Sequence, residues 1–265
     1  MTGIIYVIAD GGNARDELVV SARSVRRTMP DIPITVFSDL DISGPFDEVR
    51  LIRRPRNTTD FFRLRTELLC DSPYERTLHL DTDTYVVREV SAVFDLLDRF
   101  DIAIAHDTHR IAVPIPGIPE SYPEFNAGVI AYRAQALRAL SPTWLALYDQ
   151  HVEGVSYDQP WLRQALYESE LRVATLPPEF NFRFHLAGFY NLPVAILHAH
   201  ARESEFESVA RVATDLYPEF WSSYVHYDRQ FWGPHGSARK LLDLRDRWSR
   251  RRLARALRRL FPSHR

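Results

Sequence analysis

Apolar and polar positions alternate along the first two thirds of the chain in a strand–helix order. The apolar, largely β-branched run Ile4–Ala9 is typical of a strand that is buried on both faces of a parallel sheet. Apolar residues then recur at helical spacing from Leu18 to Val25, and a second apolar run begins at Ile34, after two prolines. This order predicts a β-α-β unit.

The same alternation continues to about residue 200. The further strands that we expect are 49–52, 77–80, 101–105, 128–132 and 194–197, and the further helices are 60–70, 91–100, 134–151 and 159–167. Strands separated by helices indicate an α/β fold with a mainly parallel central sheet. Four prolines interrupt the pattern between His106 and Glu124, and a loop of that length is usually functional.

Length and composition agree with a folded domain. The 265 residues suit one large domain or two small ones, and 45% hydrophobic with 26% charged residues excludes disordered and collagen-like classes. The single cysteine, Cys70, excludes an internal disulfide and a zinc site with several thiolates, and it favours a reducing compartment. Because the first apolar run has no basic leader and no run approaches about 20 residues, we expect a cytoplasmic protein without glycan at Asn57.

Charge is distributed unevenly. The segment Arg239–Arg265 has 11 basic and 2 acidic residues, which leaves 22 basic and 33 acidic residues before it. An acidic body is not typical of a nucleic-acid-binding domain, so we expect no nucleic acid partner. Apolar residues at helical spacing among the arginines predict an amphipathic helix that either lies on an anionic membrane or packs back on the domain. We therefore divide the chain into a domain, 1–237, and a basic C-terminal helical tail, 238–265.

Two acidic residues follow the expected strand 77–80. Asp81 and Asp83 are separated by one residue, so their carboxylates lie on the same side if the extended geometry continues. Oxygen donors at the carboxyl end of a parallel strand suit Mg²⁺ or Mn²⁺, and ligands bind at this edge in open α/β sheets. The alternative is a pair of solvated acids in a turn.

The acidic pair belongs to the first of several short motifs that follow one another along the chain. They are Asp81-Thr82-Asp83, Phe125-Asn126-Ala127-Gly128-Val129, Asp158-Gln159, Phe180-Asn181 and Ile196-Leu197-His198. With them, the sequence resembles the glycosyltransferases of the GT-A fold, particularly glycosyltransferase family 8 and related retaining enzymes that use nucleotide sugars. The resemblance covers most of residues 3–200 and implies a GT-A (Rossmann-like) domain.

The resemblance implies a metal site. Asp81 and Asp83 are expected to coordinate a divalent ion bound to the donor diphosphate, and His198 matches the histidine that completes the protein ligands. Imidazole beside carboxylates favours Mn²⁺ over Mg²⁺. His200 is the alternative ligand, because alternate residues of a strand share a face.

The resemblance also implies contacts to the nucleotide and its phosphates. We expect them from Asp10 after the first strand and from Thr82 between the two aspartates. Arg63 and Arg65 on helix 60–70 are further candidates, because guanidinium groups bind phosphate oxygens through paired donors. For either arginine, the alternative is a solvated helix surface.

Four residues are expected to face the transferred sugar. Asn126 can bind sugar hydroxyls and Gly128 lets a substrate approach the backbone, although Asn126 could instead cap a turn. By resemblance, Asp158 and Gln159 are the catalytic pair. The alternative for Asp158 is a cap of the helix that begins there.

The resulting hypothesis is a metal-dependent glycosyltransferase of the hexosyltransferase class. It would move a sugar from a nucleotide-diphosphate donor, expected to be a UDP-sugar, to a glycan, lipid-linked or protein acceptor, with retention of configuration. Such acceptors and the basic tail together suggest peripheral contact with the inner face of a membrane. One alternative is a haloacid-dehalogenase-like phosphohydrolase, although two βα units precede the acidic pair here and Tyr85 stands where Thr or Val is usual. The other is a non-catalytic protein that binds sugar nucleotides.

Overall fold

The computed structural model describes the chain except for residues 10–12, 109–112, 152–153, 155–156, 187–192 and 214–265. A seven-stranded sheet in the order β3-β2-β1-β4-β7-β6-β8 forms its centre, and β5 pairs with β9 in a separate two-stranded sheet. The strands are β1 (Thr2–Ile8), β2 (Ile34–Ser38), β3 (Glu48–Leu51), β4 (Arg76–Leu80), β5 (Thr84–Val86), β6 (Ile102–His106), β7 (Phe125–Arg133), β8 (Val173–Leu176) and β9 (Ile196–His198). The expected α/β class is confirmed.

The central sheet is mostly parallel. Strand β1 is parallel to β2 and β4, β2 is parallel to β3, and β6 is parallel to β8. Strand β7 is antiparallel to both of its neighbours, β4 and β6. It follows β6 through a loop rather than a crossover helix, which is how antiparallel neighbours can be joined.

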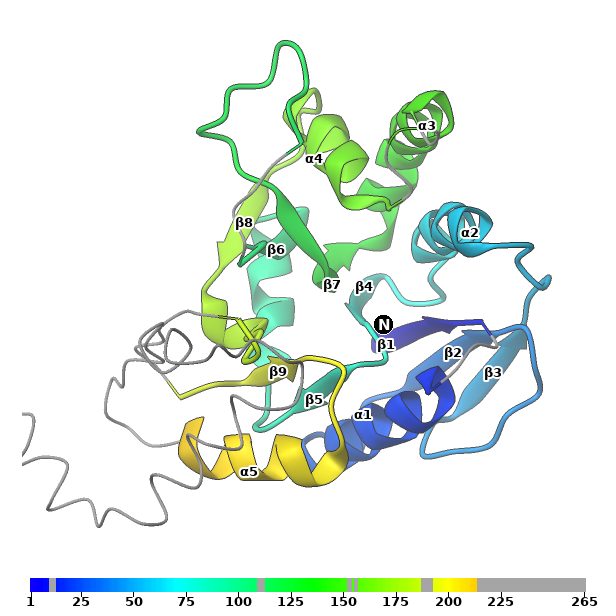
Figure 1. Cartoon of the computed structure of the whole chain (residues 1–265), viewed down its shortest axis with the longest axis vertical. Helices are drawn as coiled ribbons and strands as arrows, with labels where there is room; N and C mark the ends of the chain where they lie inside the picture. The colour runs from blue at the N-terminus through cyan, green and yellow to red at the C-terminus, as the bar shows by residue number, and fades with distance from the viewer. Residues whose placement is uncertain (10–12, 109–112, 152–153, 155–156, 187–192, 214–265) are drawn as a thin grey trace, which may run out of the picture.

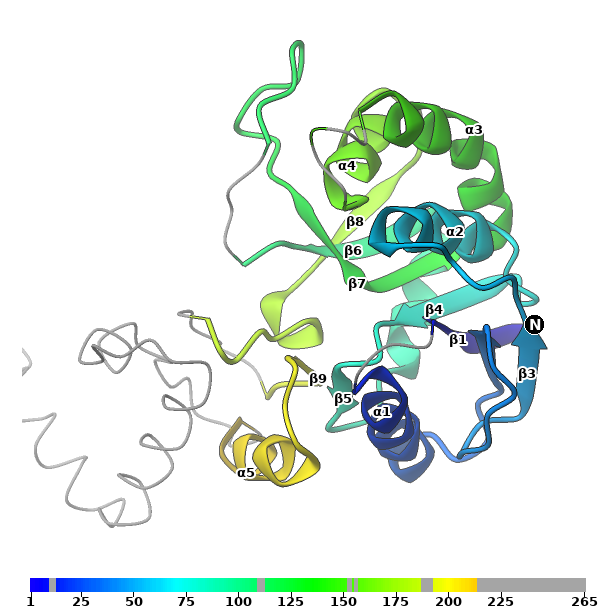
Figure 2. The ribbon, with the colours of Figure 1, turned by 45° about the vertical axis from the view of Figure 1, so that its right-hand side comes forward.

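Helices cover both faces of this sheet (Figures 1 and 2). The α-helices are α1 (Ala14–Thr28), α2 (Thr58–Cys70), α3 (Ala134–His151), α4 (Gln159–Tyr167) and α5 (Glu203–Ala213). Residues of β1 alternate between two cores: Ile4, Tyr6 and Ile8 pack with α1, whereas Ile5 and Val7 pack in the core of α2, α3 and α4. A strand apolar at every position is therefore required here, because both of its faces are buried.

Several elements differ from the sequence prediction, and helix α5 was not expected at all. The expected helix 91–100 is a 3₁₀ helix, η1 (Ser91–Asp98). Strand β8 was missed because it is only four residues long and lies at the edge of the sheet, beside β6. Strand β5 is only three residues long, too short for a periodic pattern.

The proline-rich loop between β6 and β7 projects from the sheet (Figure 1). Arg163 of α4 is buried beneath it and donates hydrogen bonds to three of its carbonyl groups. The distances are 2.6 Å to Tyr122, 3.0 Å to Val113 and 3.2 Å to Pro119. One buried guanidinium thus attaches the loop to the helix that begins at Gln159.

The tail 238–265 and the proposed domain boundary at 237 lie outside the described residues, so both stay predictions. The described part of the chain ends in α5, which lies beside α1 and is joined to it by an ion pair of 2.9 Å between Arg23 and Glu203. Among the described residues, no helix has the length and apolar character needed to cross a membrane.

Candidate metal and sugar-nucleotide site

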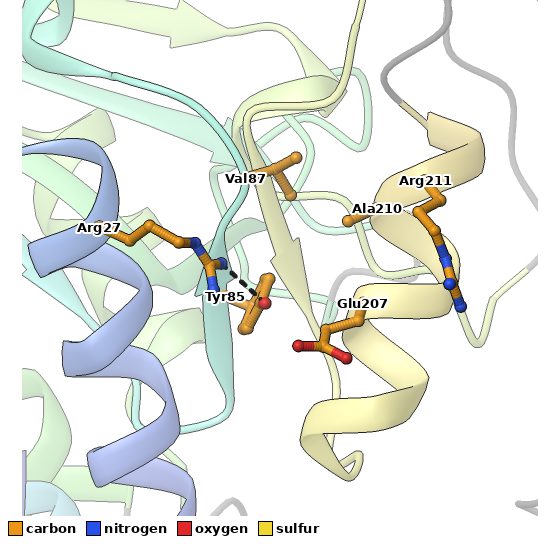
Figure 3. A pocket seen from close by; sticks show the side chains of 6 residues that line it. All are labelled: Arg27, Tyr85, Val87, Glu207, Ala210 and Arg211. Atoms are coloured by element: carbon orange, nitrogen blue, oxygen red, sulfur yellow. Dashed lines mark hydrogen bonds between the residues drawn. The ribbon is translucent and has the colours of Figure 1, made fainter.

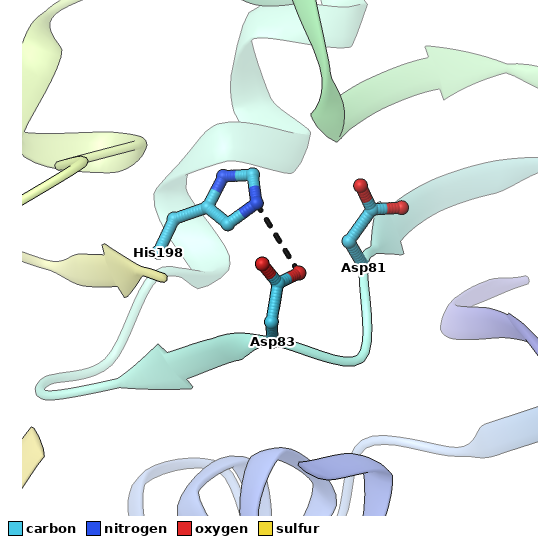
Figure 4. Close-up of side chains that lie close together, drawn as sticks. All are labelled: Asp81, Asp83 and His198. Atoms are coloured by element: carbon cyan, nitrogen blue, oxygen red, sulfur yellow. Dashed lines mark ion pairs between the residues drawn. The ribbon is translucent and has the colours of Figure 1, made fainter. Parts of the chain in front are cut away.

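Asp81 and Asp83 lie in the turn that joins β4 to β5, at the carboxyl end of β4. The N–H of Asp81 donates to the carbonyl of Gly128 on β7 at 2.8 Å, which fixes where the turn leaves the sheet. Strand β9 pairs with β5 so that His198 lies opposite Thr84. This pairing brings an imidazole from late in the chain to the acidic turn (Figure 4).

The two carboxylates and the imidazole form one cluster. Each of Asp81, Asp83 and His198 offers a ligand atom within 4.8 Å of the others. Nε2 of His198 lies 3.3 Å from Oδ1 of Asp83. Burial by itself raises the pKa of both aspartates, but their partners outweigh it: Arg65 lowers the pKa of Asp81, and the contact with His198 lowers the pKa of Asp83. Both carboxylates are therefore available as charged ligands.

The side chains of the cluster suit a divalent ion. Two carboxylate oxygens and one imidazole nitrogen are a donor set that Mn²⁺ accepts. Gly128 lies against the cluster, and a Cβ there would overlap Cε1 of His198 and lie 2.8 Å from Oδ2 of Asp81. The absence of a side chain at this position leaves the room that the two ligands occupy.

His200 lies at the rim of the cluster. Its side chain is 82% exposed, and Nδ1 lies 3.0 Å from Oε1 of Glu17 and 3.6 Å from Oδ2 of Asp83. The hydrogen bond with Glu17 raises the pKa of His200 to about 9, so the ring is protonated at neutral pH. Nδ1 of His200 is engaged by Glu17, and the cluster of three possible ligands contains His198 and not His200, so the geometry favours His198 over the alternative.

A cavity of about 330 Å³ opens over this cluster. Its walls contain nine of the residues singled out from the sequence: Arg65, Asp81, Thr82, Asp83, Asn126, Asp158, Gln159, His198 and His200. A second cavity, of about 310 Å³, lies between α1, β5 and α5, and is lined by Arg27, Tyr85, Val87, Glu207, Ala210 and Arg211 (Figure 3). Because this second cavity holds none of the expected site residues, the first is the candidate functional site.

Solved structures of one enzyme share this fold. A complex of the galactosyltransferase LgtC with donor and acceptor sugar analogs is 18% identical, with a TM-score of 0.55 over 81% of this chain and 97% of that chain. The chain has the GT-A fold. An active-site glutamine-to-glutamate mutant of LgtC, also 18% identical, gives a TM-score of 0.54 over 76% of this chain and 88% of that chain. No family model and no curated protein matches the sequence.

Arg65 is buried in the wall of this cavity. Its guanidinium donates to Oδ2 of Asp158 at 2.5 Å, to Oδ1 of Asp81 at 3.0 Å and to the carbonyl of Ala127 at 2.6 Å. Arg65 is therefore not a solvated helix residue. It connects a metal-ligand candidate to one member of the expected catalytic pair.

Arg63 lies elsewhere. It pairs with Asp149 of α3 at 2.7 Å and with Glu67 on its own helix, and it is not among the residues that line the site. Side chains two positions apart on a helix point to nearly opposite sides, so α2 cannot direct both arginines into one cavity. The expected phosphate contact of Arg63 is not supported by this placement.

Asp158 precedes α4 but makes no capping hydrogen bond with its side chain. The structure thus replaces the capping alternative with the ion pair to Arg65. The carboxylate is fully buried, and burial raises the pKa of Asp158 while Arg65 opposes that shift. An ionised carboxylate at this place depends on Arg65.

The amides of Gln159 and Asn126 meet inside the site. Oε1 of Gln159 accepts hydrogen bonds from Nδ2 of Asn126 at 3.2 Å and from the N–H of Ala127 at 3.1 Å. Nε2 of Gln159 donates to Oε1 of Glu124 at 3.4 Å. Asn126 also accepts from the N–H of Gly128, two residues further on, at 3.1 Å, so the local turn-type bond considered for it is present within the site.

Sequence reasoning missed several residues of this site. Cavity-lining residues that it did not assign are Val7, Phe61, Phe62, Tyr157 and Arg183. It named Asn181 within a motif but gave it no role. The buried carboxylates Asp107 and Glu124, which bond Asn126 and Gln159, flank the proline-rich loop and carried no motif signal. Asp10 lies outside the described residues.

Proposed function

We propose that this protein is a metal-dependent glycosyltransferase that takes its sugar from a nucleotide-diphosphate donor, with UDP as the expected carrier. The observation that carries the proposal is the convergence of Asp81, Asp83 and His198 beneath a cavity in a chain with the GT-A fold. LgtC, which shares the fold, was solved with donor and acceptor sugar analogs, and this supports a sugar acceptor as well as a sugar donor. A glycan, lipid-linked or protein acceptor and retention of configuration are part of the proposal by resemblance.

The residues of the cluster would hold the ion through the carboxylates of Asp81 and Asp83 and through Nε2 of His198. When bound, a divalent ion supplies positive charge that stabilises a departing diphosphate. Thr82, between the two aspartates, places a hydroxyl and a backbone N–H in the same cavity wall, where phosphate oxygens can accept hydrogen bonds.

Asp158 and Gln159 would act on the sugar itself. The carboxylate of Asp158, which is paired with Arg65, can stabilise positive charge that develops at the anomeric carbon. The amides of Gln159 and Asn126 line the same cavity and can bind sugar hydroxyls. Arg65 fixes Asp158 and Asp81 relative to each other, which keeps the sugar-facing and metal-facing groups in one geometry.

Neither alternative function is favoured by the site. The GT-A fold does not support a haloacid-dehalogenase-like phosphohydrolase, and Asp81 is hydrogen-bonded to Arg65 rather than held ready as a nucleophile. A non-catalytic binding protein would not need the buried Arg65–Asp158 pair beside the metal cluster, since that pair costs desolvation energy.

The test is transfer from labelled UDP-sugars in the presence of Mn²⁺, first screened by thermal shift, with Asp83→Asn as the inactive control. Labelled product from the wild type but not from Asp83→Asn supports the proposal. Release of inorganic phosphate from sugar phosphates would support the phosphohydrolase. Binding of nucleotide sugar with no product from any acceptor tested would support the non-catalytic alternative.

Membrane contact through the tail 238–265 is a separate proposal that rests on the sequence alone. Each arginine near an anionic surface contributes about 1 kcal/mol, and the attraction weakens with salt. Binding of the full chain to phosphatidylserine vesicles at low salt, lost on deletion of the tail, supports it. No binding at low salt contradicts it.

A further inference from the structure

Asn181 lies buried between the metal cluster and the sugar-facing amides. It follows the short 3₁₀ helix η2 (Pro178–Phe180), and only 4% of the residue is exposed. Its side chain contacts Oδ1 of Asn126 at 2.8 Å on one side and Nδ1 of His198 at 2.7 Å on the other. The hydrogen-bonding sense of these contacts decides which nitrogen of His198 carries a proton.

The backbone fixes the orientation of Asn126. The N–H of Gly128 can only donate, and it lies 3.1 Å from one end of the Asn126 amide, which must therefore be the oxygen. The other end lies 3.0 Å from Oδ2 of Asp107, and an ionised carboxylate can only accept, so this end must be the nitrogen. A flipped Asn126 amide would place its oxygen against the carboxylate oxygen of Asp107 and its nitrogen against the N–H of Gly128.

The orientation of Asn126 in turn fixes that of Asn181. Because Oδ1 of Asn126 is an acceptor, the group that faces it must be Nδ2 of Asn181. Oδ1 of Asn181 then faces His198, and an amide oxygen can only accept. Nδ1 of His198 must carry the proton, which leaves Nε2 as the nitrogen with a lone pair when the ring is neutral. Nε2 is the nitrogen that lies 3.3 Å from Asp83.

We propose that Asn181 is a positioning residue that holds the proton of His198 on Nδ1 and thereby directs Nε2 to the metal cluster. The metal part of this inference rests on the proposed function, whereas the position of the proton does not. Without Asn181, nothing in this set of hydrogen bonds opposes the other tautomer, in which Nε2 donates to Asp83. In that tautomer, Nε2 of His198 would carry the proton and would have no lone pair for a metal ion.

The same hydrogen bonds reach the expected catalytic pair. Nδ2 of Asn126 donates to Gln159 as well as to Asp107. The N–H of Gly128 orients Asn126, and Asn126 orients both Asn181 and Gln159. The same backbone N–H thus determines the orientation of the imidazole of His198 and of the amide of Gln159. Outer partners of this kind typically change metal affinity by about 10- to 100-fold.

The first test is the ¹⁵N NMR spectrum of the imidazoles in the metal-free full chain, with the His198 signals assigned from a His198→Gln variant. We expect Nδ1 to be protonated in the wild type and in Asn181→Asp, whose carboxylate still accepts from it. We expect a mixture of tautomers in Asn181→Ala. A neutral His198 with its proton on Nε2 in the wild type would overturn the inference.

The second test is calorimetric affinity for Mn²⁺ alone, without nucleotide. We expect Asn181→Ala to bind about 10- to 100-fold more weakly than the wild type, and Asn181→Asp to bind more tightly than Asn181→Ala. Ser72→Ala, which removes buried hydrogen bonds to Thr77 and Tyr74 at the other end of β4, should lose thermal stability but keep wild-type affinity. Affinity of Asn181→Ala within twofold of the wild type would contradict the inference.

The two tests separate this inference from the proposed function. If the wild type shows the Nδ1 proton and binds Mn²⁺ but transfers no sugar, the positioning role stands and the proposed function fails. If the wild type binds no Mn²⁺, the spectra still decide where the proton lies. If Asn181→Ala does not fold, the wild-type spectrum and that of the nearly isosteric Asn181→Asp decide the result.

Discussion

Arg65 and Asp158 form a fully buried ion pair, with 2.5 Å between Nη1 and Oδ2, although they come from helix α2 and from the turn before α4. The same guanidinium reaches Asp81 at 3.0 Å. One positive charge thus compensates the buried Asp158 and the partly exposed Asp81, whose side chain is 34% exposed. We expect the stability of the site and its proposed chemistry to depend on the same contact.

Replacing Arg65 with Met should lower the free energy of unfolding by about 3–5 kcal/mol, because it leaves the buried carboxylate of Asp158 without its partner. Arg63→Met is the matched control from the same helix. Arg63 is about one-third exposed, and its ion pairs with Asp149 and Glu67 should contribute no more than about 1 kcal/mol. Urea unfolding of both variants measures the difference, and equal losses would argue against the buried pair.

The two histidines should differ in metal binding. His198→Ala should lower Mn²⁺ affinity by more than about tenfold, since even outer partners of metal ligands have effects of that size. His200→Ala should leave affinity within about threefold, because the ring is 82% exposed, contacts Glu17 and lies outside the cluster of three possible ligands. Isothermal calorimetry without nucleotide makes the comparison. The reverse order would move the ligand to His200.

Gly128→Ala should disrupt the metal cluster. The added Cβ would overlap Cε1 of His198 and lie 2.8 Å from Oδ2 of Asp81, so one of the two ligands must move. We expect Mn²⁺ affinity and transfer to fall together. Gly154→Ala is the control, since its Cβ would meet no atom of the described residues closer than 3.7 Å, and it should leave both unchanged. Wild-type Mn²⁺ affinity in Gly128→Ala would show that the cluster tolerates the methyl group.

The sequence predicted those features of the fold and the site that depend on a single short segment, such as one strand or one motif. Strand β1 was readable because burial on both faces requires a continuous apolar run. The three metal-ligand candidates were readable as motifs, but only the family resemblance implied that they converge, because the convergence depends on the antiparallel pairing of β5 with β9. Pairing between segments this distant in the chain leaves no periodic signal in either one.

The choice between Arg63 and Arg65 was also beyond the sequence. The phase of a helix is usually read from its apolar residues, but α2 buries Asp60, Arg65 and Thr66 along with its leucines. Because polar residues lie on the buried face of α2, the apolar pattern alone does not show which side of the helix is buried. The role inferred for Asn181 could not be read from the sequence either, because it depends on the orientation of the Asn126 amide on β7.

The ionised carboxylate of Asp60 should contribute to the free energy of unfolding, and this contribution should be lost at low pH. Hydrogen bonds from Arg53, at 2.7 and 2.8 Å, and from the N–H of Arg56 lower the pKa of Asp60 below its ordinary value. A carboxylate with a lowered pKa stabilises the folded state above its unfolded pKa, about 4, and this stabilisation is lost as pH falls toward the folded pKa. Asp60→Asn should therefore be less stable than wild type at pH 7, with a smaller gap at pH 3. Urea unfolding at both pH values checks this, and a gap independent of pH would contradict it.

Asp158→Asn tests whether this carboxylate acts on the sugar. If Asp158 only capped α4, the change would be nearly silent, because Asn and Asp are comparable caps. No capping bond is present and the carboxylate bonds Arg65, so we expect a loss of about 1.5–3 kcal/mol in unfolding free energy, the range for hydrogen bonds to charged groups. We also expect kcat to fall by about 10²–10³, the range for removal of one group that stabilises charge in the transition state.

Stability and catalysis must be separated in this experiment. Turnover should be measured well below the melting temperature of the variant, where all of the protein is folded. Gln159→Ala is the companion variant, since it removes an amide that Asn126 and the N–H of Ala127 hold in the same cavity without changing any charge. Affinity for UDP with Mn²⁺ should survive in both variants, because neither residue belongs to the metal cluster. Wild-type kcat in Asp158→Asn, together with the expected loss of stability, would leave Asp158 as the buried partner of Arg65 and remove it from the chemistry.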